Sequence, residues 1–453
     1  MNARQIKDII SYAEKKLELK ERDCEYKANR LLEIMQSGLE GVELEDAIYG
    51  ELSLLPSEID KRFSYVLIES GSKAATDWLY NYCVSNKYVK KDVLDKNPRF
   101  DTENGLTVTI NKAKPEFRDP KKAKTGNSVD GGFAKCVICR ENEGFGTRNK
   151  RNLRTVSISL GAQPWFWQYS PYGYFHEHGI AVNCEHIPMH VDRQTFVNLL
   201  DFVDMFPHYF IGCNAPLERI GGSVLAHDHY QGGGEVLPLH KAKIRRYIKD
   251  MHHPTAKIGI LDWAGTVIRI KSDKRNEIAD VAERLREAWI NYSNPELGII
   301  AEDNNGVHNA ISPTVIKTAD GYEMNVILRS NITSEKYPDG VFHAHPEYHA
   351  IKKESIGLIE AQGLFILPGR LEEQLNEIER IIEAKSALPP EYAEFKLVYD
   401  ETKALYESGK YEDIHKALQE ELGSICYRIL ENTAVFKREE DFLRFLKTAG
   451  FEI

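Results

Sequence analysis

Two histidines and a glutamine occupy alternate positions in a glycine-flanked segment of this 453-residue chain, residues 221–234. In an extended backbone alternate side chains share a face, so His227, His229 and Gln231 are expected to point into the same space. A neutral imidazole is a nucleophile toward phosphorus, and a side-chain amide can donate to a phosphoryl oxygen. The segment therefore predicts nucleotide transfer through a covalent histidine. Taken alone, the His-x-His pair fits a metal site or an ordinary surface loop more often.

A second group of residues has the spacing of metal ligands. Cys136 and Cys139 form a Cys-x-x-Cys on an expected turn, and two such thiolates can share one tetrahedral zinc ion. The chain has no second Cys-x-x-Cys, so the remaining ligands must be histidines, with His186, His190 and His227 as candidates. A redox pair or two inert buried thiols fit the motif alone equally well.

Two further stretches are less specific. A later His343-Ala344-His345 echoes the first pair and hints at a duplicated unit, with coincidence as the alternative. Lys112, Lys114 and Arg118 precede the cysteines. They could hold phosphates or form a solvated basic stretch.

The composition excludes several classes of protein. A net charge of −10 argues against a general nucleic-acid binder, which would show a basic face. The first residues are charged rather than apolar, and no apolar run approaches the roughly 18 residues that span a bilayer. The seven cysteines are scattered, which fits a reducing compartment. We expect a soluble cytoplasmic protein with neither nucleic acid nor membrane as a partner.

The elements that position these residues follow from the hydrophobic pattern. Alternating stretches predict strands at 106–110, 155–160, 179–182 and 324–328, and helical spacing predicts helices at 192–205, 274–292 and from 371 onward. Strands and helices in this mixed order predict an α+β fold rather than a doubly wound sheet. The chain divides into a helical region at 1–95, strand-rich regions at 96–240 and 241–368, and a helical region at 369–453.

In this order the motifs resemble the galactose-1-phosphate uridylyltransferases of the type found in Gram-positive bacteria, a family of the histidine-triad superfamily. The resemblance rests on Cys136-x-x-Cys139, a Pro-x-His ending at His190, His227-Asp228-His229-x-Gln231 and His343-x-His345. It implies two tandem histidine-triad-like units, 96–240 and 241–368, built from antiparallel sheets with helices. It also implies a homodimer.

The same resemblance implies a ping-pong reaction of galactose metabolism, in which UMP passes from UDP-glucose to galactose 1-phosphate through a uridylyl-histidine. His229 would be the nucleophile, and Gln231 would hold the phosphate oxygens. A structural zinc ion would be bound by Cys136, Cys139, His190 and His227. Substrate contacts would come from Asn214, Gly222, Ser223, Lys353, Glu360, His343 and His345. The alternatives are a dinucleoside polyphosphate phosphorylase or hydrolase of the same superfamily and a non-catalytic, zinc-stabilised nucleotide-binding module.

Three departures from related patterns bear on the reaction. Histidine-triad hydrolases carry a third histidine where Gln231 stands, and glutamine can bind a phosphate without relaying protons. This favours transfer to a sugar 1-phosphate, whose phosphate oxygen leaves and attacks as an anion. Asp228 replaces the proline of the better-known type, and strand alternation is expected to point its carboxylate to the opposite face. The glutamate of that type's second metal site has no counterpart after Gln231.

Overall fold

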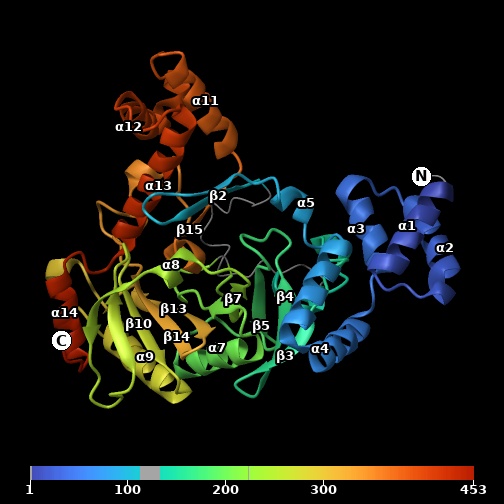
Figure 1. The fold of residues 1–453 in the computed structure, drawn as a ribbon, viewed down its shortest axis with the longest axis horizontal. Helices are drawn as coiled ribbons and strands as arrows, with labels where there is room; N and C mark the ends of the chain where they lie inside the picture. Colours follow the sequence, from blue (N-terminus) through green and yellow to red (C-terminus); the bar gives the residue numbers. More distant parts are fainter. Residues whose placement is uncertain (1–2, 113–132, 223) are drawn as a thin grey trace.

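A ten-stranded antiparallel sheet forms the centre of the protein, with helical regions at both ends (Figure 1). The computed structural model describes residues 3–112, 133–222 and 224–453. In spatial order the strands of this sheet are β3 (Val156–Leu160), β4 (Gln163–Tyr169), β5 (Gly179–Asn183), β7 (His229–Gly233), β6 (Phe210–Gly212), β13 (Asn309–Thr318), β14 (Gly321–Ser330), β10 (Val267–Ser272), β9 (Lys257–Leu261) and β8 (Ile244–Ile248).

The large sheet consists of two five-stranded halves with the same topology. In each half three successive strands are followed by a helix and two more strands, and the fifth strand lies between the third and the fourth. The helices are α7 (Arg193–Met205) and α9 (Arg275–Ile290). The halves join through their fourth strands, with Gly212 of β6 opposite Thr314 of β13. The predicted α+β fold with two tandem units is confirmed, while the boundaries at 95, 240 and 368 stay predictions.

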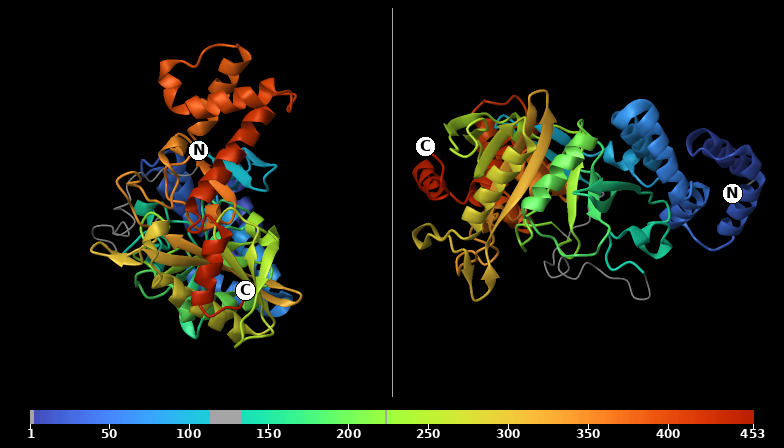
Figure 2. Two further views of the ribbon diagram at one scale, coloured as in Figure 1. Left: turned by 90° about the vertical axis from the view of Figure 1, so that its left-hand side faces the viewer. Right: turned by 90° about the horizontal axis from the view of Figure 1, so that it is seen from below.

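Helices α7 and α9 cover one face of this sheet (Figures 1 and 2). Helix α7 begins after Asp192, whose carboxylate accepts a hydrogen bond from the Thr195 backbone N–H and so satisfies one of the unpaired groups at a helix start. On the sheet, Trp167 contacts Phe202 of α7, their ring centroids 5.1 Å apart. Tyr230 of β7 points to the same face. Because side chains alternate along a strand, His229 and Gln231 must face the opposite way.

A three-stranded sheet crosses that opposite face. It contains β1 (Arg99–Asp101), β2 (Thr107–Asn111) and β15 (Leu364–Pro368), and β15 runs parallel to β2. Leu364 and Ile366 of β15 pack in one buried cluster with Phe210 of β6. The short helices α8 (Pro238–Lys241) and α10 (Leu358–Ala361) lie in this second layer. The side of β7 that carries His229 and Gln231 is therefore enclosed between two sheets.

Helices make up the two ends of the chain. The N-terminal helices are α1 (Ala3–Lys16), α2 (Cys24–Met35), α3 (Gly41–Leu52), α4 (Pro56–Ser85) and α5 (Lys91–Leu94). Helices α11 (Leu371–Glu383), α12 (Lys396–Glu407) and α13 (Ile414–Thr433) extend away from the sheets, whereas α14 (Glu439–Thr448) returns to pack its Phe445 against Trp289 of α9 (Figure 1). A small hairpin joins β11 (Glu302–Asp303) to β12 (Gly306–Val307). Among the described residues no helix has the length and apolar character to cross a bilayer.

Candidate functional site

His229 is the first residue of β7 and pairs with Val182 of β5. Its side chain is buried, with Nδ1 2.8 Å from the carbonyl oxygen of His227. A carbonyl only accepts, so Nδ1 carries the hydrogen and Nε2 keeps its lone pair. Burial lowers the pKa of His229 to about 4, which leaves the imidazole neutral at pH 7. This is the protonation state that a histidine nucleophile requires.

Gln231 lies two residues further along β7, on the same face as His229. Its Oε1 lies 3.3 Å from Nε2 of His178, a buried residue directly before β5. Sequence reasoning missed His178. The available signal was the sequence His176-Glu177-His178, a further His-x-His next to an expected strand.

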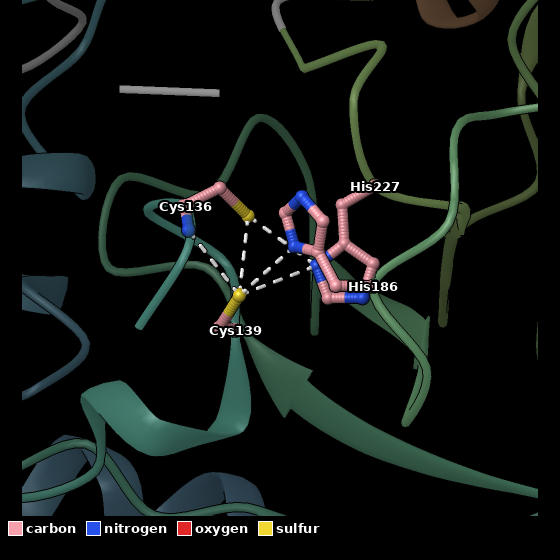
Figure 3. A group of neighbouring side chains, drawn as sticks. All are labelled: Cys136, Cys139, His186 and His227. Carbon is pink, nitrogen blue, oxygen red and sulfur yellow. Dashed lines mark hydrogen bonds between the residues drawn. The ribbon is translucent and has the colours of Figure 1, made fainter. Parts of the chain in front are cut away.

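The two cysteines lie together with two histidines in one buried group (Figure 3). Nδ1 of His227 is 3.3 Å from Sγ of Cys136 and 3.6 Å from Sγ of Cys139, and Nδ1 of His186 is 3.2 Å from Sγ of Cys139. One potential ligand atom from each residue lies within 4.8 Å of the other three. This is the only such group within the described ranges, and its two thiols and two imidazoles are a donor set that suits a tetrahedral ion.

The surroundings of this group orient its ligand atoms. The Nε2–H of His227 donates to the backbone oxygen of Asn183 at 2.8 Å, which turns the Nδ1 lone pair toward the sulfurs. The Asn142 side chain donates to the carbonyls of both Cys136 and Cys139 at 2.8 Å and so holds the loop. A hydrogen bond from Cys136 lowers the pKa of Cys139 well below its usual range, with smaller contributions from the two imidazoles. A thiolate at this position is the form that binds a metal ion.

The structure does not bring His190, the predicted fourth ligand, into the cysteine group. Its side chain is exposed and its Nδ1 lies 3.9 Å from the Asp228 carboxylate, outside the cysteine group. His186 takes the place because the loop after β5 folds back there. The Asp228 backbone N–H donates to Ile187 at 2.8 Å and brings the 186–187 turn beside His227.

The segment after β14 contains a buried ion pair. Lys352 is buried and its Nζ lies 2.9 Å from Glu360 and 3.2 Å from Glu354, whereas Lys353 is exposed. The prediction selected Lys353, but the turn at 351–353 directs Lys352 inward. Of the two predicted residues, Glu360 is thus inside this group and Lys353 is outside it.

Asn214 and Gly212 hold this segment against the first half of the sheet, the half that contains β7. The Oδ1 of Asn214 accepts a hydrogen bond from the Leu358 backbone N–H at 2.8 Å. Gly212, which pairs with Gln231, lies under the Leu358 side chain, and a Cβ there would come within 2.8 Å of Leu358 Cδ2. Gly222 lies against the Asn214 amide, with a would-be Cβ 2.9 Å from Nδ2. Glycine at 212 and 222 therefore allows close approach of these groups.

The remaining predicted residues lie elsewhere. His343 is buried with its Nδ1 3.2 Å from the Ala344 oxygen, and burial lowers its pKa to about 4. His345 stacks on Tyr337 with centroids 4.0 Å apart. Lys112 pairs with Glu372 of α11 at 2.7 Å. The predictions for Ser223, Lys114 and Arg118 fall outside the described residues.

Comparison with known proteins identifies the family. Residues 42–188 match the model for the N-terminal domain of galactose-1-phosphate uridyl transferase, and residues 201–392 match that for its C-terminal domain. A galactose-1-phosphate uridylyltransferase of Bifidobacterium longum is 55% identical over 414 residues, covering 91% of this chain and 80% of that protein. One from Fusobacterium nucleatum is 37% identical over 473 residues, covering 98% and 91%.

A structure comparison gives a weaker likeness. The crystal structure of yeast Ap4A phosphorylase Apa2 aligns with 12% sequence identity and a TM-score of 0.33, over 73% of this chain and 92% of that one. The two domain matches and the sequence relatives decide the assignment. The chain belongs to the galactose-1-phosphate uridylyltransferase family of nucleotidyltransferases.

Proposed function

We propose that the protein moves UMP from UDP-glucose to galactose 1-phosphate in galactose metabolism, through a covalent intermediate on His229. The observation that carries the proposal is the state of His229: a neutral ring whose Nδ1–H is held by the His227 carbonyl, with Gln231 two residues on and on the same face. The names of the relatives supply the substrate class.

The reaction has two steps of the same kind. Nε2 of His229 attacks the α-phosphorus of UDP-glucose; an N–P bond forms, the P–O bond to the β-phosphate breaks, and glucose 1-phosphate leaves as an anion. A phosphate oxygen of galactose 1-phosphate then attacks the same phosphorus and releases His229. The Gln231 amide donates to the phosphoryl oxygens as their charge rises. It does not titrate, so it gives water no proton relay toward hydrolysis.

The acceptor half of the site comes from the second unit. Lys352 and Glu360 offer a donor and an acceptor for a sugar phosphate, and Leu358 sits directly over Gly212 beside Gln231. Asn214 connects the two parts, because its Oδ1 is engaged by Leu358. Its Nδ2 is buried with no hydrogen-bond partner among the residues that the structure describes, which leaves it as a donor for a ligand. We keep Asn214, Gly222 and Glu360 as proposed substrate-site residues and replace Lys353 by Lys352.

We propose zinc for the Cys136–Cys139–His186–His227 group. Four protein ligands would fill a tetrahedral shell, so the ion would be structural. Bound zinc would fix the loop before β7, and with it the His227 carbonyl that orients His229. We also propose that the enzyme is a cytoplasmic homodimer. The cytoplasm is supported by seven free cysteines, and the dimer by the family resemblance alone; light scattering in solution checks the dimer.

Intact-protein mass spectrometry after brief exposure to UDP-glucose tests the function. We expect a mass gain of one UMP, located on His229 by peptide mapping and removed by galactose 1-phosphate much faster than by water. His229→Gly should show no gain and lose at least about 10³-fold in turnover. An adduct on another residue, or discharge by water at the same rate, would rule the proposal out.

A further inference from the structure

We propose that His178 is a positioning residue that sets the orientation of the Gln231 amide. The Nε2–H of His178 donates to Oε1 of Gln231 at 3.3 Å and so directs the amide NH₂ group away, toward the space next to His229. The inference rests on the proposed function, because it assigns Gln231 to the phosphate.

The hydrogen-bond pattern around His178 fixes its tautomer. The Tyr174 backbone N–H donates to Nδ1 of His178 at 3.3 Å, so Nδ1 must hold the lone pair and Nε2 the hydrogen. Burial lowers the pKa of His178 to about 4, so the neutral ring keeps this single donor throughout the physiological range. His178 is therefore neither a positive charge near the phosphate nor an acid for the leaving group.

The ring is also held in place by packing. His178 is 5% exposed and stacks on Tyr174, with centroids 4.9 Å apart and planes at 26°. The Phe175 ring lies tilted against it, with centroids 4.5 Å apart. Glu177, directly before it, has a left-handed backbone with φ of 57°, which is unfavourable for a non-glycine residue. Its carboxylate accepts a hydrogen bond from Tyr209 at 2.8 Å on the far side of the chain, so Glu177 and His178 face opposite ways.

An amide needs such a partner because its two ends are nearly the same shape but opposite in hydrogen bonding. Turned the wrong way, Gln231 would present oxygen lone pairs to a phosphoryl oxygen and repel it. A donor fixed on Oε1 removes that orientation before the substrate arrives, and preorganised donors contribute most as charge develops in the transition state. His178 therefore acts on the rate of uridylylation more than on UDP-glucose binding.

The test compares two buried histidines that each hydrogen bond to a side-chain amide oxygen. His178→Phe keeps an aromatic ring between Tyr174 and Phe175 and removes the donor. The control is His308→Phe: His308 is also 5% exposed and donates to Oδ1 of Asn331 at 2.8 Å, far along the chain from β7. The measured quantity is the single-turnover rate of adduct formation with UDP-glucose, by rapid quench, in the full-length protein.

We expect His178→Phe to slow adduct formation about 10- to 100-fold, with a smaller change in half-saturation by UDP-glucose, and His308→Phe to leave the rate unchanged. In a Gln231→Ala background His178→Phe should cause no further loss, because there is no amide left to orient. His178→Gln, which can still donate, should recover part of the rate. An equal loss in both backgrounds, or an equal loss in the His308 variant, would overturn the proposal.

Nitrogen NMR of the wild-type protein gives a readout that does not depend on activity. Near pH 7 the His178 ring should be neutral and carry its hydrogen on Nε2. The Nε2 signal should shift in Gln231→Leu. Hydrogen on Nδ1 instead would contradict the proposal even if His178→Phe failed to fold. Absence of any adduct in the wild type, with this NMR signature intact, would count against the proposed function and not against the hydrogen bond.

Discussion

His227 and His229 are two residues apart and use opposite nitrogens. His227 donates from Nε2 to Asn183 and leaves Nδ1 facing the cysteines, while His229 donates from Nδ1 to His227 and leaves the lone pair on Nε2 for the proposed attack on phosphorus. Each tautomer is set by a backbone carbonyl, which cannot change its role with pH. The same short segment thereby contributes to both the proposed metal site and the proposed nucleophile.

The choice between His186 and His190 gives a prediction about the metal. His186→Ala removes a ligand from the cysteine group, so purified protein should contain well under one zinc per chain and melt at a lower temperature. His190→Ala is the matched control and should keep its zinc, because its ring lies outside the group. Elemental analysis of both variants decides; loss of zinc only in the His190 variant would reverse the assignment.

The neighbouring lysines give a second prediction. Lys352→Met removes this cation from the buried Glu360 and the half-buried Glu354, which should cost about 3–5 kcal/mol of unfolding free energy. It should also slow transfer to galactose 1-phosphate. Lys353→Met, at an exposed position, should change stability by less than about 0.5 kcal/mol. Denaturant unfolding and steady-state kinetics measure both; similar losses in the two variants would refute the placement of Lys352.

Many residues of the candidate site, but not all of them, could be predicted from the sequence. His229, Gln231 and the cysteine pair could be located because alternation along one strand and a Cys-x-x-Cys are local patterns. The selection of His186 over His190, and of Lys352 over Lys353, depends on the path of a turn, which no local pattern specifies. His178 reaches Gln231 only because β5 pairs with β7.

At the scale of elements, the fifth strands of the two halves have diverged. In β7 the positions facing the second layer carry His229 and Gln231. In β14 they carry Asn325 and Glu323, and both engage Arg269 of β10, at 2.7 and 3.1 Å. The predicted duplication is therefore present in the topology. The interpretation of His343-Ala344-His345 as its echo was wrong, since these residues lie in the loop after β14.

The contact between α12 and α13 contains a carboxylate that should make stability depend on pH. Burial, together with the hydrogen bond that its protonated carboxyl donates to Glu401, raises the pKa of Glu421 to about 8, although Arg428 lies 2.7 Å away. Above the ordinary glutamate pKa of about 4 the unfolded chain loses this proton while the folded protein keeps it, so the free energy of unfolding falls as the pH rises toward 8.

Glu421→Gln removes this titration. Its melting temperature should exceed that of the wild type at about pH 8, and the advantage should disappear near pH 4. Glu407→Gln, at an exposed position of the same helix pair, should show no such trend. Thermal melts across this range measure it, and a constant offset at every pH would contradict the argument.

The positions of the strands and helices could be predicted from the sequence, whereas the pairing of the strands could not. Strands β2, β3, β5 and β14 and helices α7, α9 and α11 lie where periodicity placed them, since a buried face leaves a local pattern. Nothing local indicates that residues 107–111 pair with 364–368, or that α14 leaves the C-terminal helices to pack on α9. Both depend on contacts between distant segments.

At the scale of the whole molecule, one side chain of α7 connects the two halves. Asp204 accepts hydrogen bonds from Arg275 of α9, Lys317 of β13 and, at 2.7 Å, Tyr322 of β14. Burial opposes ionisation, but the bonds from Lys317 and Tyr322 outweigh it and lower the pKa of Asp204. The contribution of ionised Asp204 to the free energy of unfolding is present at neutral pH and is lost as the pH falls through the lowered pKa of Asp204.

Asp204→Asn should therefore lower the unfolding free energy at pH 7 by about 1–2 kcal/mol, with the difference shrinking near pH 3. Faster amide exchange in β6 and β13 should accompany the loss. Asp400→Asn breaks an exposed pair within α12 and should leave those strands unaffected. Unchanged exchange at the junction would show that Asp204 does not hold the halves together.

The parallel pairing of β2 with β15 joins strands roughly 250 residues apart, and contacts of such long sequence separation form slowly because the intervening chain must be closed first. Strand β7 belongs to the first half of the large sheet, whose strands are close in sequence. The three-stranded sheet above it can form only once β15, which follows the second half, is available to pair with β2. During refolding, helical circular dichroism should return before turnover does. The chain can thus position His229 before it completes the enzyme.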